Sequence, residues 1–419
     1  MKALGKLAAV SLTTLLAVTA CGGGETPVAQ GPQPLRMTIW TSNEAHLKLF
    51  NEIADEYRKA HPNVGSITFD TIPFENYTTT ITTQIAGGKA PDLAWILESS
   101  APDFVGSGAL APLNSKIENA AELVPSTTKL WQRDGELYAY PFSTSPFGMF
   151  VNTDLVKAAK QKSPQELIKA GQWDWEHVSK VNAAVAKDGK QGMTILDFDY
   201  KGWDNLATVW GGWGAKAYSD DGKSCQFNSP EMVEAMTFLH TSIFKDKAMP
   251  GPGTVADFFA GDSAMVIAQI SRAAMLKEGT FDWDLVPLPS GPKGKYAVIG
   301  QAGIGVLKKS PNAELATDFL TFFTNPANSA KLAAYFPPAR SSLLTADTMA
   351  KTNPLLKPDQ LQQVVIDGIE TGVVKPSHTG QAELAQTIRA ALDPLWTADA
   401  DVKTVLDGVC AKIQPMLGA

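Results

Sequence analysis

The chain has 419 residues, of which 44% are hydrophobic and 19% charged, and its formal net charge is −7. This length accommodates two or more domains, and the composition is that of an ordinary globular protein. The acidic balance argues against a nucleic-acid partner, because a phosphate backbone requires a basic surface. We therefore expect a folded protein that binds no nucleic acid.

The first twenty residues have the features of a secretion signal. Lys2 and Lys6 form a short basic region, and apolar residues predominate from 7 to 20. This run is shorter than the roughly 20 apolar residues that a membrane-spanning helix needs. A basic start, a short apolar core and small residues at the cleavage site describe a signal peptide over residues 1–20. The alternative is a cytosolic protein whose N-terminus is apolar by chance.

Cys21 ends the apolar run. The stretch VTAC at 18–21 resembles a bacterial lipobox, which implies cleavage before Cys21 and acylation of its thiol and new amino group. Residues 21–34 continue as CGGGETPVAQGPQP, which is rich in glycine and proline and predicts a flexible tether. We expect an extracytoplasmic protein, anchored by lipid at Cys21 to the outer face of the bacterial cytoplasmic membrane.

Strand and helix patterns alternate from residue 35 onward. Alternating apolar residues at 35–40 and 66–72, and an apolar run at 92–97, predict three strands. Apolar residues with helical spacing predict helices at 46–59 and from Tyr77 to a stop at Gly87. Strands that alternate with helices imply a parallel sheet.

A second α/β region begins near Phe147. Its pattern predicts helices at 173–187, 231–244 and 313–324, and strands at 147–152, 264–270, 282–288 and 296–307. Pro230 lies at the first turn of one helix, where its missing N–H costs little. The remainder of the chain is expected to be mostly helical.

Cys225 and Cys410 are the cysteines that remain once Cys21 is assigned to lipidation. An even number of cysteines in an oxidising compartment favours a disulfide. A bridge closing so long a loop would contribute on the order of 5 kcal/mol in the chain-entropy model. The alternative is two buried free thiols.

The common catalytic motifs are absent from the sequence: it has no G-x-S-x-G elbow, no H-E-x-x-H and no phosphate loop. GQAGIG at 300–305 lies in an extended stretch and indicates a strand that another backbone or a ligand approaches closely. The five histidines lack metal-ligand spacing. The pairs Asp197/Asp199 and Asp282/Asp284 fit solvated surface carboxylates. We expect no enzyme activity, no cofactor and no metal.

Three tryptophans, Trp203, Trp210 and Trp213, lie close together in KGWDNLATVWGGWG. An indole ring can cover the apolar face of a sugar, while amides, carboxylates and arginines bind its hydroxyls. Trp203 and Trp210 could share a helical face and pack in a core, where tryptophan is usually found. Trp213 lies in a glycine-rich loop, where ligand contact and core packing are both open.

Several stretches occur in a fixed order after the tether: FNEIADEYRKAHPNV, FENYTTTITTQIAGGKAPDLAWI, GELYAYPFSTSPFGMFVNTDL, ADFFAGDSAMVI, IGQAGIGVLKKSPNAELATDFLTFF and FPPARSSL. By their order and spacing, nearly the whole chain after the tether resembles the extracellular solute-binding proteins of ABC importers. That group includes maltose-binding and glycerol-3-phosphate-binding proteins.

The resemblance implies an α/β, type II periplasmic-binding-protein fold of two lobes. Each lobe would hold a mainly parallel sheet flanked by helices, and crossing strands would form the hinge. Residues 35–145 and 296–342 would build lobe one, and residues 146–295 and 343–419 lobe two. We expect a monomeric receptor that closes on a carbohydrate and delivers it to the transmembrane subunits of an ABC permease.

Ligand residues are expected in loops that follow strands, because ligands of open parallel sheets lie at the carboxyl ends of the strands. Tyr77 could instead pack on its own helix face, and Arg340 could instead form a surface salt bridge. Maltose-binding relatives carry a tryptophan near Ser271 that this chain lacks, which argues against maltodextrin. The polar loop after the first strand contributes Trp40, Asn43 and Glu44, and the tryptophan cluster contributes Trp213. The resemblance implies the other ligand residues, which are Tyr77, Glu98, Ser145, Ser271, Arg272, Gln301, Arg340 and His378.

Two alternatives stay open at this point. Glycerol-3-phosphate or another polyol phosphate could bind to Arg272 and Arg340. A surface lipoprotein glycoside hydrolase would share the anchor but would shorten oligosaccharides rather than return them unchanged.

Overall fold

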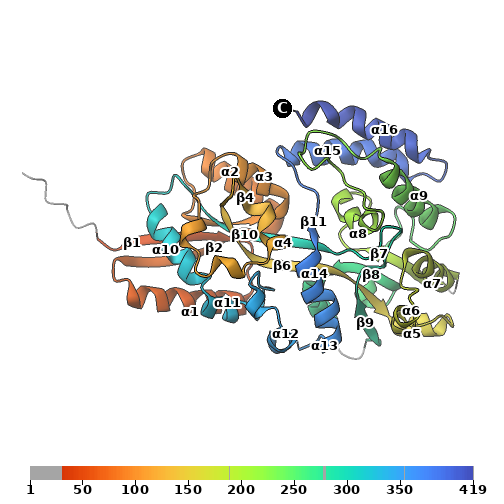
Figure 1. Cartoon of the computed structure of the whole chain (residues 1–419), viewed down its shortest axis with the longest axis horizontal. Helices are drawn as coiled ribbons and strands as arrows, with labels where there is room; N and C mark the ends of the chain where they lie inside the picture. Colours follow the sequence, from red (N-terminus) through yellow and green to blue (C-terminus); the bar gives the residue numbers. More distant parts are fainter. Residues whose placement is uncertain (1–30, 188, 277–279, 353, 419) are drawn as a thin grey trace, which may run out of the picture.

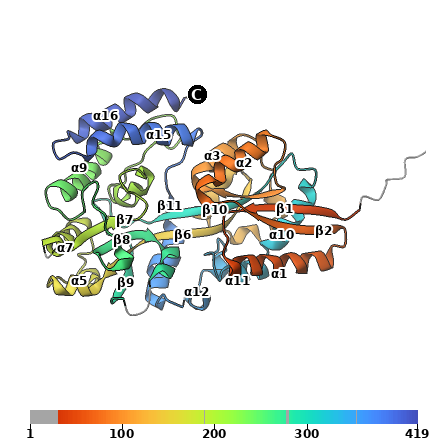
Figure 2. The same ribbon diagram turned by 180° about the vertical axis from the view of Figure 1, so that it is seen from behind.

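A computed structural model describes residues 31–187, 189–276, 280–352 and 354–418. Two lobes lie side by side, and one sheet passes from the first into the second (Figures 1 and 2). Its strands follow the order β2-β1-β3-β10-β6-β8-β7, with β11 paired to β10, β9 paired to β6, and β4 and β5 in a separate pair. The strands are β1 (Gln33–Ile39), β2 (Val64–Thr71), β3 (Leu93–Leu97), β4 (Gln132–Arg133), β5 (Glu136–Leu137), β6 (Ala139–Asn152), β7 (Gln191–Ile195), β8 (Ser263–Gln269), β9 (Trp283–Val286), β10 (Val298–Val306) and β11 (Val373–Val374).

Helices surround the sheet in both lobes (Figure 1). Lobe one carries α1 (Glu44–Ala60), α2 (Tyr77–Ala86), α3 (Ala101–Gly106), α10 (Ala313–Phe323) and α11 (Pro326–Leu332). Lobe two carries α5 (Thr153–Ala158), α6 (Pro164–Lys169), α7 (Trp175–Lys187), α8 (Ala207–Trp210), α9 (Pro230–Phe244), α15 (Gln381–Leu392) and α16 (Val402–Ile413). Near the middle of the sheet are α4 (Pro125–Thr128), α12 (Ala346–Thr352), α13 (Pro358–Gln360) and α14 (Asp367–Thr371).

In the main sheet, the strands that belong to one lobe alone run parallel to each other. In lobe one, β1 is parallel to β2 and β3, and in lobe two β7 is parallel to β8. The strands that cross between the lobes are antiparallel to most of their neighbours: β10 to β3 and β6, and β6 to β8 and β9. Only the short β11 is parallel to β10 among the described strands. The predicted two-lobed α/β fold is therefore confirmed. In the main sheet every antiparallel pair involves β6 or β10, and the separate pair β4–β5 is antiparallel as well.

Strand β6 contributes to both lobes. Up to Pro146 it pairs with β10, and from Phe147 onward it pairs with β8 and β9. Strand β10 brings the chain back, and its first residues pair with β11, as Val298 does with Val373. The lobes are thus connected by β6, by β10 and by the segment through α14 and β11.

Most of the predicted elements are confirmed, with ends that differ by a few residues. The exception is β6, for which the sequence predicted only 147–152, whereas the strand begins at Ala139. The stretch YPFSTSP in its first half contains two prolines and no apolar alternation. Its strand conformation depends on pairing with β10, which lies far away in sequence. Likewise β1 starts at Gln33, inside the predicted tether.

Helix α1 shows how the sequence sets an element of lobe one. The Asn43 side chain caps it by accepting hydrogen bonds from the amides of Ala45 and His46. Such a cap stabilises a helix by about 1 kcal/mol. Phe50 and Tyr57 are among its buried residues, at the spacing of one helical face.

Buried apolar side chains form three clusters. One fills lobe one around residues such as Phe50, Trp95 and Phe323. A second fills lobe two, where Trp203 and Trp210 stack with ring centroids 6.4 Å apart. The expected core packing of these two tryptophans is confirmed. The third cluster lies against the crossing strands and includes residues of both lobes.

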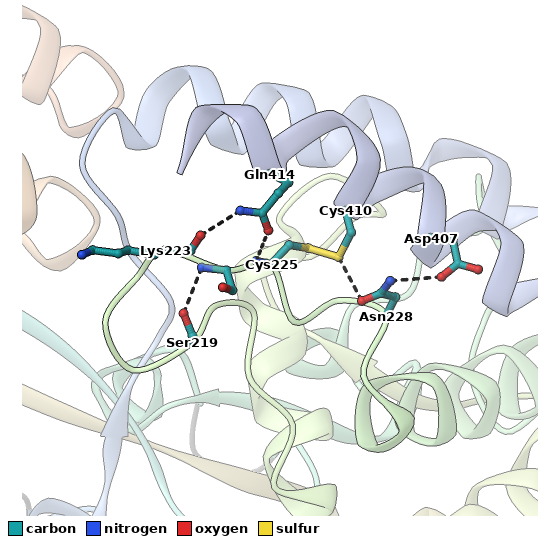
Figure 3. The surroundings of a disulfide bond; sticks show 8 residues. Ser219, Lys223, Cys225, Asn228, Asp407, Cys410 and Gln414 are labelled. Atoms are coloured by element: carbon teal, nitrogen blue, oxygen red, sulfur yellow. Dashed lines mark hydrogen bonds between the residues drawn. A yellow bond between two sulfur atoms is a disulfide. The ribbon is translucent and has the colours of Figure 1, made fainter. Parts of the chain in front are cut away.

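The end of the chain is held against the middle of lobe two. The sulfur atoms of Cys225 and Cys410 lie 2.01 Å apart, so α16 and the loop before α9 meet as a disulfide requires (Figure 3). Gln414 adds two hydrogen bonds to the same loop, accepting from the Cys225 amide and donating to the Lys223 carbonyl. Three contacts therefore fix the loop to the C-terminal helix.

The predicted signal peptide, Cys21 and most of the predicted tether lie outside the described residues. Among the residues that are described, no helix has both the length and the apolar character required to span a membrane.

Candidate functional site

A cavity of about 2010 Å³ is lined by residues of both lobes. This is larger than the roughly 300–1,000 Å³ of most small-molecule sites, and it suits an extended ligand. Lobe one contributes α3, residues 126–133, Tyr296 and Ala297, and lobe two contributes Trp173, residues 207–220 and residues 287–295. Residues 363–379, around α14 and β11, complete the lining.

Aromatic rings provide much of the apolar surface of this cavity: Phe147, Trp173, Trp210, Tyr218 and Tyr296. Trp173 donates its indole N–H to the carbonyl of Pro287 at 2.8 Å, and Tyr296 donates its hydroxyl to Thr208 O at 2.5 Å. Their polar atoms are therefore occupied, which leaves ring carbon for contact with a ligand.

Tyr218 differs from the other aromatic residues of the lining. Its hydroxyl is buried and has no hydrogen-bond partner among the described residues. Burial, followed by the charge of Asp204, raises the pKa of this hydroxyl, so it stays protonated at neutral pH. An unpaired buried hydroxyl costs free energy, and a ligand with hydroxyl groups could satisfy it.

Charges in the lining are nearly balanced. The basic residues are Lys129, Arg133, Lys216, Lys295 and Lys375, and the acidic residues are Asp103, Asp220, Asp367 and Glu370. Lys216 pairs with Asp220 at 2.6 Å. This balance suits a polar, uncharged ligand better than a strongly anionic one.

Lys375, just after β11, contacts both lobes. Its Nζ atom lies 2.7 Å from Asp204 Oδ2, 3.1 Å from Asn205 Oδ1 and 3.5 Å from Glu98 Oε1. Burial by itself lowers the pKa of Lys375, but the two carboxylates outweigh it and the pKa ends above its usual value. The side chain is therefore a protonated cation at neutral pH.

None of the predicted ligand residues belongs to the cavity lining, although several contact it. Glu98 pairs with Lys375. His378 precedes the lining residue Thr379, contacts the Tyr218 ring with centroids 5.2 Å apart, and hydrogen-bonds through Nε2 to Gly222 O. Glu98 and His378 thus lie immediately behind the wall of the cavity.

A second group of predicted residues lies at the carboxyl ends of strands. Trp40 follows β1, is partly buried, and packs edge-on against Tyr77 and Trp95 at 5.1 and 4.7 Å. Ser271 and Arg272 follow β8, and Arg272 pairs with Asp197 at 2.9 Å. The adjacent residues Asn43 and Glu44 begin α1, where Asn43 serves as the cap.

A third group is buried in structural roles. Tyr77 is buried inside lobe one, where its hydroxyl donates a hydrogen bond to Thr38 O. In this structure its side chain is therefore packed in the lobe. Trp213 is buried against Phe238, with centroids 5.0 Å apart, rather than facing the cavity.

Arg340 is likewise buried in lobe one. The side chain is 0% exposed, and it donates to the carbonyls of Thr324 and Asn119 and pairs with Glu122. The expected alternative was a surface salt bridge, but the ion pair is internal to lobe one. Arg340 is absent from the lining of the cavity.

Ser145 and Gln301 lie on the paired crossing strands. The Ser145 hydroxyl and the Gln301 Oε1 atom are buried without a partner among the described residues, as is the Thr144 hydroxyl beside them. Gln301 donates its side-chain amide N–H to Thr127 O at 3.1 Å. The centre of the hinge is therefore polar and incompletely hydrogen-bonded.

Sequence reasoning missed the residues that do line the cavity. Lys375 lies three residues before His378, in a stretch with no signal for a cation of the site. Its partner Asp204 follows Trp203 in sequence and does not itself line the cavity. Trp173 and Tyr296 were assigned only to a helix and a strand. The described residues contain no group of three or more His, Cys, Asp or Glu side chains arranged to hold a metal ion.

A family model described as bacterial extracellular solute-binding protein matches residues 52–358. The chain therefore belongs to this family, whose members act outside the cytoplasm. The arabinooligosaccharide-binding protein of Bacillus subtilis is 25% identical over 327 residues, or 73% of this chain and 72% of that protein. The lactose-binding protein of Rhizobium radiobacter is 24% identical over 332 residues, or 75% of this chain and 73% of that protein.

Solved structures share the fold. The cyclic α-maltosyl-1,6-maltose binding protein of Arthrobacter globiformis aligns with a TM-score of 0.79 at 17% identity, over 92% of this chain and 99% of that one. An ABC substrate-binding protein of Listeria monocytogenes, solved with cycloalternan, aligns with a TM-score of 0.76 at 22% identity, over 92% and 99% of the two chains.

Proposed function

We propose that this solute-binding protein captures a carbohydrate between its lobes and delivers it to the transmembrane subunits of an ABC importer. The observation that carries the proposal is the cavity shared by both lobes, with aromatic rings beside a nearly balanced set of polar and charged groups. Rings cover the apolar faces of sugars and polar groups bind hydroxyls. The names of the relatives, which bind arabinooligosaccharides and lactose, support the same ligand class.

A neutral sugar fits better than a polyol phosphate. The phosphate alternative relied on Arg272 and Arg340, but Arg340 is enclosed in lobe one and Arg272 is paired with Asp197. The cavity itself carries almost as many acidic as basic groups. A dianionic phosphate would require an excess of positive charge or a set of backbone donors.

Binding shifts an equilibrium between open and closed lobes toward the closed form, which docks on the permease. The proposed lobes are residues 35–145 with 296–342, and residues 146–295 with 343–419. The exchange of β6 partners between Pro146 and Phe147 supports the first boundary. Trp40, Glu98, Ser271, Arg272 and His378 stay in the proposed ligand site as residues that an open–closed motion brings toward the ligand.

The remaining parts of the proposal concern the state of the mature protein. It is a monomeric lipoprotein without catalytic activity, acylated at Cys21, with a disulfide between Cys225 and Cys410. Membrane fractionation of the natural chain against Cys21→Ala tests the anchor. Thiol titration of unfolded, unreduced protein tests the bridge, and two free sulfhydryls would refute it.

Thermal shift against a panel of arabino-, gluco- and galacto-oligosaccharides, followed by calorimetry on the hits, tests the ligand class. We expect at least one oligosaccharide to raise the melting temperature and to be recovered intact after incubation. Stabilisation by amino acids, peptides or polyol phosphates alone would refute the carbohydrate assignment, and shortened oligosaccharides would establish a hydrolase.

A further inference from the structure

Lys375 is the buried cation that touches acidic groups of both lobes. Glu98 begins the turn after β3 in lobe one, and Asp204 lies in the turn before α8 in lobe two. The three side chains are 15%, 13% and 29% exposed, in the order Lys375, Glu98, Asp204. They are therefore shielded from solvent, where ion pairs act more strongly than at a surface.

The ring of Phe147 adds to this shielding. The Lys375 Nζ atom lies 5.9 Å from the centroid of that ring, within the range of a cation–π contact. Phe147 is the first residue of β6 to pair within lobe two, and both Phe147 and Lys375 line the cavity. The cation thus lies where the crossing strands meet the ligand space.

In this structure the carboxylates of Glu98 in lobe one and Asp204 in lobe two both lie within reach of the same Nζ atom, at 3.5 and 2.7 Å. If lobe two rotates away, Lys375 can keep Asp204 and Asn205, which are 2.7 and 3.1 Å from its Nζ atom, but Glu98 is left behind with lobe one. If the Lys375 cation is removed instead, Glu98 and Asp204 lose the positive charge that they share. Two carboxylates would then face each other across the gap, and like charges at short range repel.

We propose that Lys375 is a positioning residue that favours the closed arrangement by neutralising Glu98 and Asp204 across the gap between the lobes. The inference rests on the proposed function for its ligand, because a closed arrangement that exists before binding lowers the cost of capture. A ligand that binds the closed form has its affinity reduced by the fraction of molecules that are open.

The test compares Lys375→Met, which keeps the length and apolar stem of the side chain, with Lys331→Met as a matched control. Lys331 pairs with Glu56 at 2.8 Å between distant segments, but both belong to lobe one. Small-angle X-ray scattering without ligand should show a larger radius of gyration for Lys375→Met only. Lys375→Arg keeps the cation and should remain as compact as the natural protein.

Calorimetry with any oligosaccharide that stabilises the natural protein provides the second measurement. We expect Lys375→Met to raise Kd at least about tenfold, and Lys331→Met to leave it unchanged. Glu98→Gln removes the lobe-one partner alone and should also expand the ligand-free protein, which keeps the test valid if Lys375→Met fails to fold.

Equal radii of gyration for the natural protein and the Lys375→Met and Glu98→Gln variants would overturn the role of Lys375. This comparison needs no sugar. A panel in which no carbohydrate binds would therefore refute the proposed ligand and leave the lobe-closing role of Lys375 to be judged by scattering alone.

Discussion

Among single residues, the Tyr218 hydroxyl is the most specific indication of what the cavity binds. It is buried beside the ligand space, and no residue that the structure describes forms a hydrogen bond with it. Replacing it in Tyr218→Phe removes one oxygen and leaves the ring in place. Because the oxygen makes no hydrogen bond in the ligand-free protein, thermal stability should stay the same or rise slightly.

The affinity for a ligand, unlike thermal stability, should fall in Tyr218→Phe. If a sugar hydroxyl pairs with Tyr218, Tyr218→Phe should weaken Kd by about two- to tenfold, the worth of one net hydrogen bond. Calorimetry on both proteins measures the change. Equal affinities would show that the hydroxyl lies outside the ligand contact, and Tyr57→Phe, which removes an unpaired hydroxyl in the core of lobe one, is the control.

Arg340 is expected to act on stability and not on binding. Its guanidinium is enclosed, with Thr324 O at 2.9 Å and Glu122 at 3.7 Å. Removing one partner of a buried ion pair costs about 3–5 kcal/mol. Arg340→Met should therefore lower the free energy of unfolding in urea by about 3 kcal/mol or more, with Kd of the folded fraction unchanged. The exposed Arg58→Met should cost less than about 1 kcal/mol.

The residues of the site were harder to predict than the fold for a physical reason. Tyr77 and Arg340 follow motifs that place them in the right segments, but burial depends on what the rest of lobe one packs against them. Lys375 has no local signal of its own, because its partners Glu98 and Asp204 are distant in sequence and in different lobes.

At the scale of elements, the spacing of apolar residues predicts a helix or strand wherever its cap and its apolar face lie within one short stretch of sequence. Helix α1 has its cap and its apolar face within a single stretch, and the predicted range 46–59 agrees with the observed helix to within two residues at each end. The first half of β6 has neither, and it is a strand only because β10 lies beside it. Local sequence determines elements that are locally stabilised, and long-range pairing determines the rest.

The contact between α16 and the loop at Cys225 supports one wall of the cavity, since Tyr218 to Asp220 lie on the same loop. The double variant Cys225→Ser with Cys410→Ser should lower the free energy of unfolding by about 2–5 kcal/mol. Denaturation of oxidised natural protein against the variant measures this. If reduction of the natural protein leaves its stability unchanged, the bridge does not form in solution.

Strand β7 runs so close to the segment after α9 that only glycine fits at position 192. A Cβ atom there would lie 2.1 Å from the carbonyl oxygen of Ala248, which is backbone and cannot rotate away. Overpacking of this kind costs about 1–3 kcal/mol. Gly192→Ala should therefore lower the urea midpoint, while Gly251→Ala, where the added atom meets nothing, should not.

At the scale of the whole molecule, Lys375 is not alone in joining the lobes. Asp103 on α3 of lobe one accepts a hydrogen bond at 2.8 Å from the amide of Gly380, which caps α15 of lobe two. Such a contact joins residues that are 277 positions apart in the chain, and it forms between the two lobes. Each contact adds to the same open–closed equilibrium.

Asp103→Ala should therefore shift that equilibrium in the same direction as Lys375→Met, but less. Losing one charge-assisted hydrogen bond near the surface corresponds to a Kd that is about two- to tenfold weaker. The control is Asp55→Ala, which removes an ion pair with Arg58 within α1. Since each lobe has its own core, urea unfolding of both variants should match that of the natural protein. A change in unfolding without a change in Kd would mean that Asp103 stabilises lobe one rather than the closed form.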